Sequence, residues 1–418
     1  MGLSKPIEHI KLKIIVKKEY LKDTIRGESN MKPAIVVVGY NRPNDIKRLL
    51  NNINGAKYDT DDIPLIISLD KAQNEADIVK IAEEFQWLHG EKIIRTFPER
   101  QGLRKHIVQC GDLSEKYGAV IILEDDLLVS PNFYNYVQQA ISFYEDEEKV
   151  TGFALYSHEW NGYARRNFVP MADAYDVYMG QYSITWGQCW TFKQWSGFKK
   201  WYLEHEDRLG DNDKIPANIN RWSKQSWGRY FVNYIVEKDL YYVIPRISLS
   251  TNCSDVGEHV RNQDNSHQVR LLLSEEKEYV FPKFDKAWHY DIFFENSDLY
   301  SYIPEVEDKD ALCMNLTGIE KNIDRKYVLS TRSLPYKQVK TYGLQLRPIE
   351  MNVLWNIPGE EIILYDTRET NQVPPSSLPH VLKYEIRGFN TRDIKVMFID
   401  ALKRSASIKL KGIWRKKK

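Results

Sequence analysis

The sequence predicts an α/β domain built on a mostly parallel sheet with helices on both faces. Between about residues 34 and 144, short apolar runs rich in β-branched residues alternate with longer segments whose apolar residues recur at helical spacing. Strands that alternate with helices form βαβ units, in which the crossover helices cover both faces of a parallel sheet. The length of 418 residues leaves room for a second domain beyond this one.

Four strands are predicted in this part of the chain. Each is a short aliphatic run bounded by glycine, proline or charged residues. The runs are "AIVVVGY" from Ala34, "IPLIISLD" from Ile63, "KIIRTF" from Lys92 and "AVIILEDD" from Ala119. Because these runs do not alternate with polar residues, we expect the strands to be buried on both faces.

A helix is predicted after each strand. The segments are "RPNDIKRLLNNI" (42–53), "EADIVKIAEEFQWL" (75–88), "RKHIVQCGDLSEKY" (104–117) and "NFYNYVQQAISFYED" (132–146). In the first of these, apolar residues from Ile46 to Ile53 recur at helical spacing. For the last, Ser130 and Pro131 are predicted to be the N-cap and the first-turn residue.

Composition divides the chain into four parts. Residues 1–30 are predicted to be a polar, basic extension, and residues 31–262 the α/β domain. Within that domain, residues 151–259 are rich in Trp, Tyr and Gly, and we expect an irregular region there. Residues 263–392 form a C-terminal extension to which the sequence assigns no chemistry. Residues 393–418 are predicted to be a basic amphipathic tail.

Charge and hydropathy exclude several classes of protein. The 59 basic and 58 acidic residues give a net charge of +1, so no general positive field indicates nucleic-acid binding. The first twenty residues lack the apolar core of a signal peptide, and no run of eighteen apolar residues predicts a transmembrane helix. We therefore expect a cytoplasmic protein.

The tail leaves two interpretations open. Eight Lys or Arg residues occur from Lys403 onward, and no acid follows Asp400. Apolar residues such as Ile408, Leu410 and Trp414 are interleaved with them. Such a segment can lie on an anionic membrane surface, which would make the protein peripheral on the inner face of the cell membrane. The alternative is a solvated basic tail.

Polar clusters follow three of the predicted strands. They are "GYNRP" (39–43), "SLD" (68–70) and "EDD" (124–126). Ligands of open α/β sheets bind beyond the carboxyl ends of the strands, and parallel strands bring those ends to one edge. The sequence therefore predicts a binding site at this edge.

The three consecutive acids are the most informative of these clusters. Adjacent carboxylates repel one another and need a cation or hydrogen-bond donors. Their oxygens suit magnesium or manganese, which usually also holds substrate phosphates. The alternation of side chains along a strand predicts that Glu124 and Asp126 point to one face and Asp125 to the other. The alternative is a solvated acidic loop or a set of helix N-caps.

Five segments together resemble inverting glycosyltransferases of the GT-A fold. They are "VVVGYNRPNDIKRLL", "IISLD", "GAVIILEDDLLVSPNFYNY", "SITWGQCWTFKQW" and "SLSTNCSDVGEH". The nearer resemblance is to a bacterial branch of glycosyltransferase family 2, which carries a Trp-Gly-x-x-x-Trp box and an Asn…Gly-x-His box. The N-acetylglucosaminyltransferase I family is more distantly similar and has its own Glu-Asp-Asp-Leu segment. The resemblance covers residues 33–262 and implies a Rossmann-like GT-A fold.

The resemblance implies roles for the acids. Asp126 would ligate the divalent metal that bridges the two phosphates of a nucleotide-sugar. Glu124 and Asp125 would contact ribose or sugar, or orient that ligand. His259 would lie on a loop that closes over the diphosphate or reaches the metal.

It also implies a nucleoside pocket. Tyr40, Asn41 and Arg42 would line this pocket, although Arg42 could instead pair or cap locally. Asp70 would accept a hydrogen bond from the base, which suits the N–H of uracil; the alternative is that it caps the next helix. Trp186, with Trp190, would belong to acceptor-side walls and core.

The catalytic base is left open. Inversion requires a base that removes the proton of the acceptor hydroxyl. N-acetylglucosaminyltransferase I has paired aspartates between tryptophans, whereas "RWSKQSWGRY" here has no carboxylate around Ser226. Asp211 and Asp213, just upstream, or Glu159 in "SHEWNG" could serve.

The resemblance thus implies a metal-dependent hexosyl- or N-acetylhexosaminyl-transferase. It would move a sugar from a nucleotide-sugar, expected to be a UDP-sugar, to a glycan or lipid-linked acceptor in surface polysaccharide synthesis. One rival is a sugar-phosphate nucleotidyltransferase, but "GYNRPND" is not the Gly-rich phosphate loop expected of it. A second rival is a non-catalytic nucleotide-sugar or glycan-binding protein. The missing carboxylate near Ser226 is compatible with this alternative, because such a protein needs no catalytic base.

Overall fold

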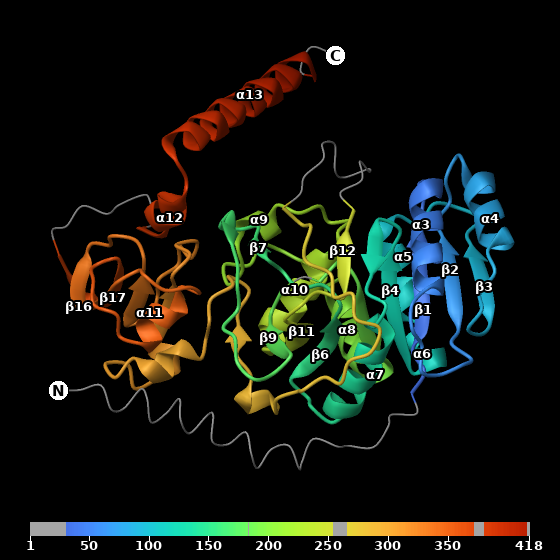
Figure 1. Cartoon of the computed structure of the whole chain (residues 1–418), viewed down its shortest axis with the longest axis horizontal. Helices are drawn as coiled ribbons and strands as arrows, with labels where there is room; N and C mark the ends of the chain where they lie inside the picture. The colour runs from blue at the N-terminus through green and yellow to red at the C-terminus, as the bar shows by residue number, and fades with distance from the viewer. Residues whose placement is uncertain (1–30, 183, 254–265, 372–379, 416–418) are drawn as a thin grey trace.

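The chain forms two domains, followed by a long helix (Figure 1). The computed structural model describes residues 31–182, 184–253, 266–371 and 380–415. The first domain is built on a nine-stranded sheet and the smaller second domain on a four-stranded sheet.

The nine-stranded sheet is mostly parallel, as predicted. Its strand order is β13-β9-β11-β6-β10-β4-β1-β2-β3. The strands that run in one direction are β1 (Ala34–Gly39), β2 (Leu65–Leu69), β3 (Lys92–Thr96), β4 (Ala119–Glu124), β6 (Val150–Ala154) and β11 (Tyr241–Pro245). Those that run in the opposite direction are β9 (Val177–Gly180), β10 (Gln188–Thr191) and β13 (His289–Tyr290).

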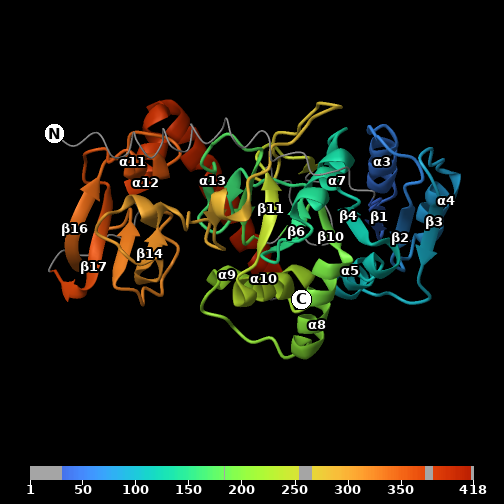
Figure 2. The ribbon, with the colours of Figure 1, turned by 90° about the horizontal axis from the view of Figure 1, so that it is seen from below.

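Helices cover both faces of this sheet, which Figure 2 shows nearly edge-on. One face packs against α3 (Pro43–Asn54), α4 (Glu75–Glu84) and α7 (Phe133–Tyr144). The other packs against α5 (Leu103–Gly111), α8 (Phe192–His205) and α10 (Trp227–Lys238), with α6 (Ser114–Tyr117) beyond α5. Each face of the sheet has its own hydrophobic core, and successive residues of a strand point into the two cores in turn. Ile121 therefore packs on the first face and Ile122 on the second. The α/β prediction is confirmed.

Two predicted helix ends are wrong. Helix α7 begins at Phe133 with Asn132 as N-cap, rather than after an N-cap at Ser130. The N–H of Ser130 donates to the carbonyl oxygen of Leu249 at 2.8 Å, which holds Ser130 in line with the preceding strand. Helix α4 ends at Glu84, because Trp87 leaves the helix to enter the core.

The region predicted to be irregular combines long loops with regular elements. Its described residues, 151–182 and 184–253, supply strands to the middle of the large sheet and two of its covering helices. They also contain α9 (Ala217–Asn220) and the short pair β7 (Trp160–Asn161) and β8 (Arg166–Asn167).

The predicted domain boundary at residue 262 is also wrong. Strand β13 completes the large sheet, and Tyr279 and Phe281 pack into its core. The 3₁₀ turn η1 (Phe284–Lys286) lies between them and β13. This edge pairing joins residues far apart in sequence, and no local pattern indicates it.

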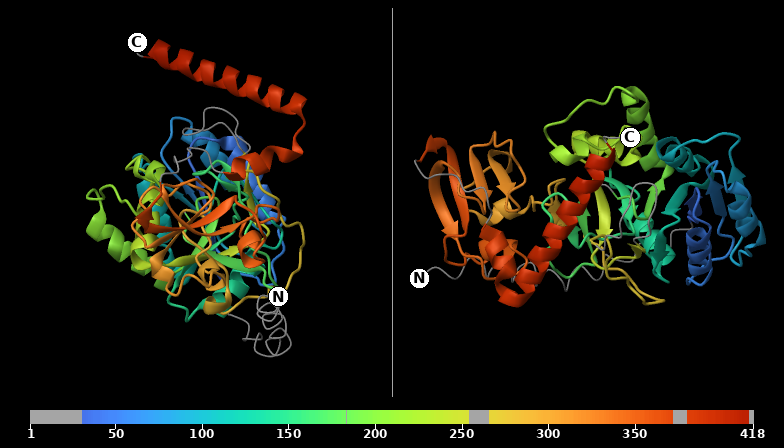
Figure 3. Two further views of the ribbon diagram at one scale, coloured as in Figure 1. Left: turned by 90° about the vertical axis from the view of Figure 1, so that its left-hand side faces the viewer. Right: turned by 90° about the horizontal axis from the view of Figure 1, so that it is seen from above.

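The second domain is a small β-domain. Its strand order is β14 (Leu312–Asn315), β15 (Tyr327–Ser330), β17 (Ile362–Thr370) and β16 (Tyr336–Tyr342). The helical elements η2 (Leu299–Tyr302), η3 (Lys309–Ala311) and α11 (Glu350–Leu354) accompany it. The chain then continues into α12 (His380–Glu385), η4 (Ile386–Gly388) and α13 (Thr391–Arg415), and Figure 3 shows α13 projecting away from both domains.

Candidate active site at the carboxyl edge of the sheet

The large sheet brings the three polar clusters to one edge, as predicted. Strand β1 lies between β2 and β4, with Gly39 opposite Leu69 and Val38 opposite Glu124. After β1 the chain builds β2 and β3 on one side and then returns to place β4 on the other. The gap between β1 and β4 is therefore the topological switch point, where such sheets bind their ligands.

The three acids form a turn that is held by one arginine. Strand β4 ends at Glu124, and residues 124–126, here called the acid turn, lead into β5 (Leu127–Val129). The guanidinium of Arg42 donates to the carboxylates of both Asp125 and Asp126, with 3.2 Å between Nη1 and Asp126 Oδ2. Its Nε also lies 3.5 Å from Oδ2 of Asp45. Arg42 thus joins the chain after β1 to the chain after β4, in addition to its local pair.

The prediction that Asp125 and Asp126 point to opposite faces is wrong. Both carboxylates reach the same guanidinium. The alternation rule holds only while the backbone stays extended, and the chain turns directly after Glu124.

Burial changes the protonation behaviour of the acid turn. Burial raises the pKa of Glu124 well above its usual value, and the charges of Asp126 and Asp125 raise it further, against the effect of Arg42. Burial also raises the pKa of Asp125 to about 6, although Arg42 opposes this shift. No hydrogen bond from another described residue reaches the Glu124 side chain. The carboxyl group of Glu124 is therefore available to bind a cation or a hydroxyl group of a ligand.

Asp70 holds a neighbouring loop. Its Oδ1 accepts hydrogen bonds from the N–H groups of Lys71 at 2.8 Å and Gln101 at 2.7 Å, and its Oδ2 from Gly102 at 2.9 Å. It does not cap α4, whose N-cap is Asn74. Asp70 therefore fixes the loop that opens α5, at the edge where the nucleoside pocket is predicted.

That loop also contains Arg100, a candidate site residue that was not predicted. The guanidinium of Arg100 lies 4.7 Å from the ring centroid of Tyr40, a cation–π contact beside the end of β1. Asn41 is exposed, and its carbonyl oxygen accepts a hydrogen bond from Asn74 Nδ2 at 3.2 Å. The signal for Arg100 was present, because the third predicted strand ends at the same edge and a polar segment follows it.

The last box of the resemblance runs beside the acid turn. Strand β12 (Ser250–Asn252) pairs antiparallel with β5, and the N–H of Cys253 donates to the carbonyl oxygen of Asp126 at 2.9 Å. His259, the predicted second metal ligand, lies outside the described residues, as does the N-terminal extension.

An aromatic wall stands next to this ribbon. The ring of Trp186 stacks on that of His267 with centroids 4.6 Å apart, and Tyr156 lies 4.8 Å from Trp186. The carbonyl oxygen of Trp186 accepts a hydrogen bond from Ser250 Oγ, which ties the wall to β12. Trp190, by contrast, is fully buried in the core.

The structure separates the three candidate bases. Glu159 follows β6, a strand parallel to β4, and so lies at the edge of the acid turn; its Oε1 is 2.6 Å from Nε of Arg270. The Asp211 side chain is 84% exposed and lies 3.5 Å from Arg229 on α10. Ser226, at the position where the carboxylate is missing, is the N-cap of α10.

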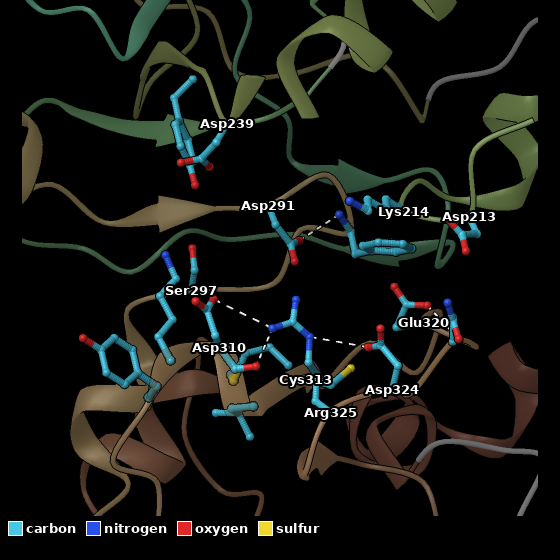
Figure 4. A pocket seen from close by; sticks show the side chains of 17 residues that line it. Asp213, Lys214, Asp239, Asp291, Ser297, Asp310, Cys313, Glu320, Asp324 and Arg325 are labelled. Atoms are coloured by element: carbon cyan, nitrogen blue, oxygen red, sulfur yellow. Dashed lines mark hydrogen bonds and ion pairs between the residues drawn. The ribbon is translucent and has the colours of Figure 1, made fainter. Parts of the chain in front are cut away.

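Asp213 lines a different site, shown in Figure 4. This pocket of about 430 Å³ lies between the two domains and also contains Asp239, Tyr241, Asp291 and Arg325. Tyr241 begins β11 whereas Glu124 ends β4, and the two strands run in the same direction. The pocket therefore borders the opposite edge of the sheet, and within the described ranges no contact joins Asp213 to the acid turn.

Comparison with known proteins identifies the large domain. The family model named GNT-I family matches residues 4–207, which include the acid turn and most of the edge around it. Over this stretch, which is just under half of the chain, the protein is similar to the GNT-I family of glycosyltransferases. The mostly parallel sheet between two helical layers is a GT-A arrangement. No curated protein matches this chain in sequence.

Solved structures give more distant matches. TarS of S. aureus in complex with UDP-GlcNAc has 13% identity and a TM-score of 0.36, over 55% of this chain and 60% of that chain. The mannosyltransferase PcManGT from Pyrobaculum calidifontis, in complex with GDP-Man and Mn²⁺, has 10% identity and a TM-score of 0.32, over 59% and 66%. GalNAc-T7 with UDP, GalNAc and Mn²⁺ has 12% identity and a TM-score of 0.35, over 51% and 42%. The chain spans less than two thirds of the length of each.

Proposed function

We propose that this enzyme transfers a hexosyl or N-acetylhexosaminyl group from a UDP-sugar to a hydroxyl group of a glycan or lipid-linked acceptor, with inversion at the anomeric carbon. The observation that carries the proposal is the acid turn held by Arg42 at the switch point between β1 and β4. A nucleotide-sugar carries a diphosphate, and a site for it needs cationic groups placed by a rigid sheet edge.

The proposal includes a divalent cation, manganese or magnesium, at Asp126. Within the described residues, no three His, Cys, Asp or Glu side chains form a ready-made metal site. Such cations commonly take one or two protein carboxylates and complete their coordination with substrate phosphates and water. Asp126 fits this pattern, because Arg42 engages only its Oδ2. When bound, the cation would stabilise the charge that develops on the departing nucleoside diphosphate.

The chain's own residues would position the donor. Arg42 fixes the acid turn and adds positive charge next to the diphosphate. Glu124, whose side chain is free of hydrogen bonds from described residues, would bond to a hydroxyl of ribose or sugar. Tyr40 and Arg100 would flank the nucleoside, on the loop that Asp70 holds.

Glu159 is the candidate base that the geometry favours. It follows β6 at the same edge as the acid turn, beyond the aromatic wall that contains Trp186. Its pairing with Arg270 would orient the carboxylate toward an acceptor hydroxyl. Asp211 and Asp213 lack this placement.

The biological setting is part of the same proposal. Synthesis of surface polysaccharide from lipid-linked acceptors takes place at the cytoplasmic face of a membrane, where nucleotide-sugars are available. No helix in the described part of the chain combines the length and apolar character needed to cross a bilayer.

A thermal-shift panel tests the donor class. Ligands that bind only the folded protein raise its apparent stability. We expect UDP-sugars with manganese to raise the melting temperature more than GDP-sugars or UDP-sugars with a chelator. The Asp126→Asn variant should lose the manganese-dependent part of the shift, and Asp45→Asn, which alters a neighbouring partner of Arg42, should keep it. Absence of a shift with any nucleotide-sugar would contradict the proposal.

A further inference from the structure

Helix α13 exposes large apolar side chains to solvent. Phe398 is 63% exposed and Leu402 is 54% exposed, and Ile394 and Met397 are exposed as well. Ile394, Phe398 and Leu402 are spaced by four positions, so they line one face of the helix, and Met397 flanks it. Val396 and Ile399 are exposed as well, so apolar surface extends beyond this face. Asp400 and Arg404 form an ion pair beside it, with 2.9 Å between Oδ2 and Nε. The described part of α13 therefore exposes a broad apolar surface.

Neither domain covers this apolar face. Every described side chain from residue 391 to 405 is exposed. The left-hand view of Figure 3 shows α13 extending away from the body. Contiguous exposed apolar surface of this kind marks a site of interaction with a partner or a membrane.

Charge indicates which partner fits. The sequence from Lys403 to the end has eight basic residues and no acid, and places Ile408, Leu410 and Trp414 among them. A helix with an apolar face and a cationic end suits an interface that is apolar inside and anionic outside. A parallel pairing with α13 of a second copy would bring two such cationic ends together, which repel.

We propose that α13 binds the surface of an anionic lipid bilayer. Its apolar face, from Ile394 through Leu402, would enter the boundary between headgroups and acyl chains, and Lys403 and Arg404, which follow, would bind the headgroups. In Figure 1, α13 and β12 both lie toward the top of the molecule. Because β12 pairs with the strand that follows the acid turn, docking would bring the active-site edge to the membrane-facing side, an assignment that rests on the proposed function.

Vesicle flotation with the full chain tests the proposal. The probes are vesicles of phosphatidylcholine alone and of phosphatidylcholine mixed with phosphatidylglycerol. We expect binding only to the mixed vesicles, and weakening by added salt. The pair Lys403→Gln and Arg404→Gln should weaken binding about fivefold for each charge removed. The pair Phe398→Ser and Leu402→Ser should weaken it at least about tenfold.

The control variant is Leu203→Ser. Leu203 lies on α8 and is 61% exposed, which matches Phe398, but it lies outside α13. It should bind vesicles like the unaltered chain. Equal binding by all variants, or no binding to anionic vesicles, would overturn the proposal. Analytical ultracentrifugation without lipid adds a further test: a dimer that Phe398→Ser and Leu402→Ser dissociate would assign the face to a second copy. Neither experiment contains a nucleotide-sugar. Failure of vesicle binding would therefore reject the membrane proposal and leave the proposed transferase function untouched.

Discussion

The carboxylate of Asp70 accepts a hydrogen bond from the backbone N–H of Gly102, with 2.9 Å between Oδ2 and N. This bond joins the end of β2 to the start of α5 across 32 positions of the sequence. Gly102 has a φ of 75°, a conformation that glycine adopts without strain. The pair fixes the backbone beside the predicted nucleoside pocket, so Asp70 affects that pocket through the loop.

Replacing Asp70 should therefore loosen the loop. Asp70→Ala removes the acceptor for three backbone N–H groups in a residue that is 4% exposed. We expect the free energy of unfolding to fall by about 2–4 kcal/mol: one hydrogen bond to a charged group contributes about 1.5–3 kcal/mol, and bonds that share one carboxylate do not contribute additively. UDP affinity, measured by calorimetry, should fall with it. Asp77→Ala, an exposed acid on α4, is the control, and equal stability of the two variants would refute the role.

The acid turn allows the metal ligand to be separated from its neighbours. Asp126→Asn should reduce manganese-stimulated turnover at least about 100-fold, because it removes a hard anionic oxygen where leaving-group charge develops. Asp125→Asn should weaken donor binding without abolishing its manganese dependence, since its oxygen is engaged by Arg42. Donor affinity titrated with and without manganese checks both. Full metal stimulation in Asp126→Asn would assign the ligand elsewhere.

The choice of base can be tested by a matched pair. Glu159→Gln preserves the shape of the side chain but cannot accept a proton, and should lower kcat by about 10²–10⁴-fold with UDP affinity unchanged. Asp213→Asn, in the pocket at the opposite edge, should leave kcat as it is. The reverse pattern would show that the interdomain pocket takes part in the reaction.

Buried Glu350 should make stability depend on pH. Burial raises its pKa to about 7, and Glu295 adds to the shift. Between the usual value near 4.5 and about 7, the folded chain holds a proton that the unfolded chain releases, so the group's contribution is present at low pH and is lost as pH rises. Glu350→Gln should therefore gain about 1–3 kcal/mol relative to the unaltered chain between pH 4 and pH 8. Urea unfolding at the two pH values measures this, and an equal difference at both would contradict it.

The elements that could be predicted from the sequence are those that depend on local patterns of apolar and polar residues. The first four strands and the place of Arg42, Asp70 and the acid turn follow from aliphatic runs and the rule that ligands gather at carboxyl ends. That rule needs only the direction of neighbouring strands. It did not give the pairing of Asp125 with Arg42, because a turn after Glu124 ends the alternation on which the prediction depended.

Other features depended on contacts between distant segments. Strand β13 is short, and only its partner β9 shows that it belongs to the large sheet. The strands between residues 151 and 259 are interrupted by loops and rich in aromatic residues that also serve as core. The same residue types fill the wall around Trp186 and the interior around Trp190, so composition could not separate the two.

Strand β13 also has a consequence for how the enzyme is made. Until residue 290 has left the ribosome, the outer edge of β9 has no partner, and its unpaired N–H and C=O groups can recruit another chain. A recombinant form that stops at residue 262 would keep that edge open permanently and would lack Tyr279 and Phe281 from the core. Such a form should aggregate during expression, whereas one that extends through Asn296 can close the sheet.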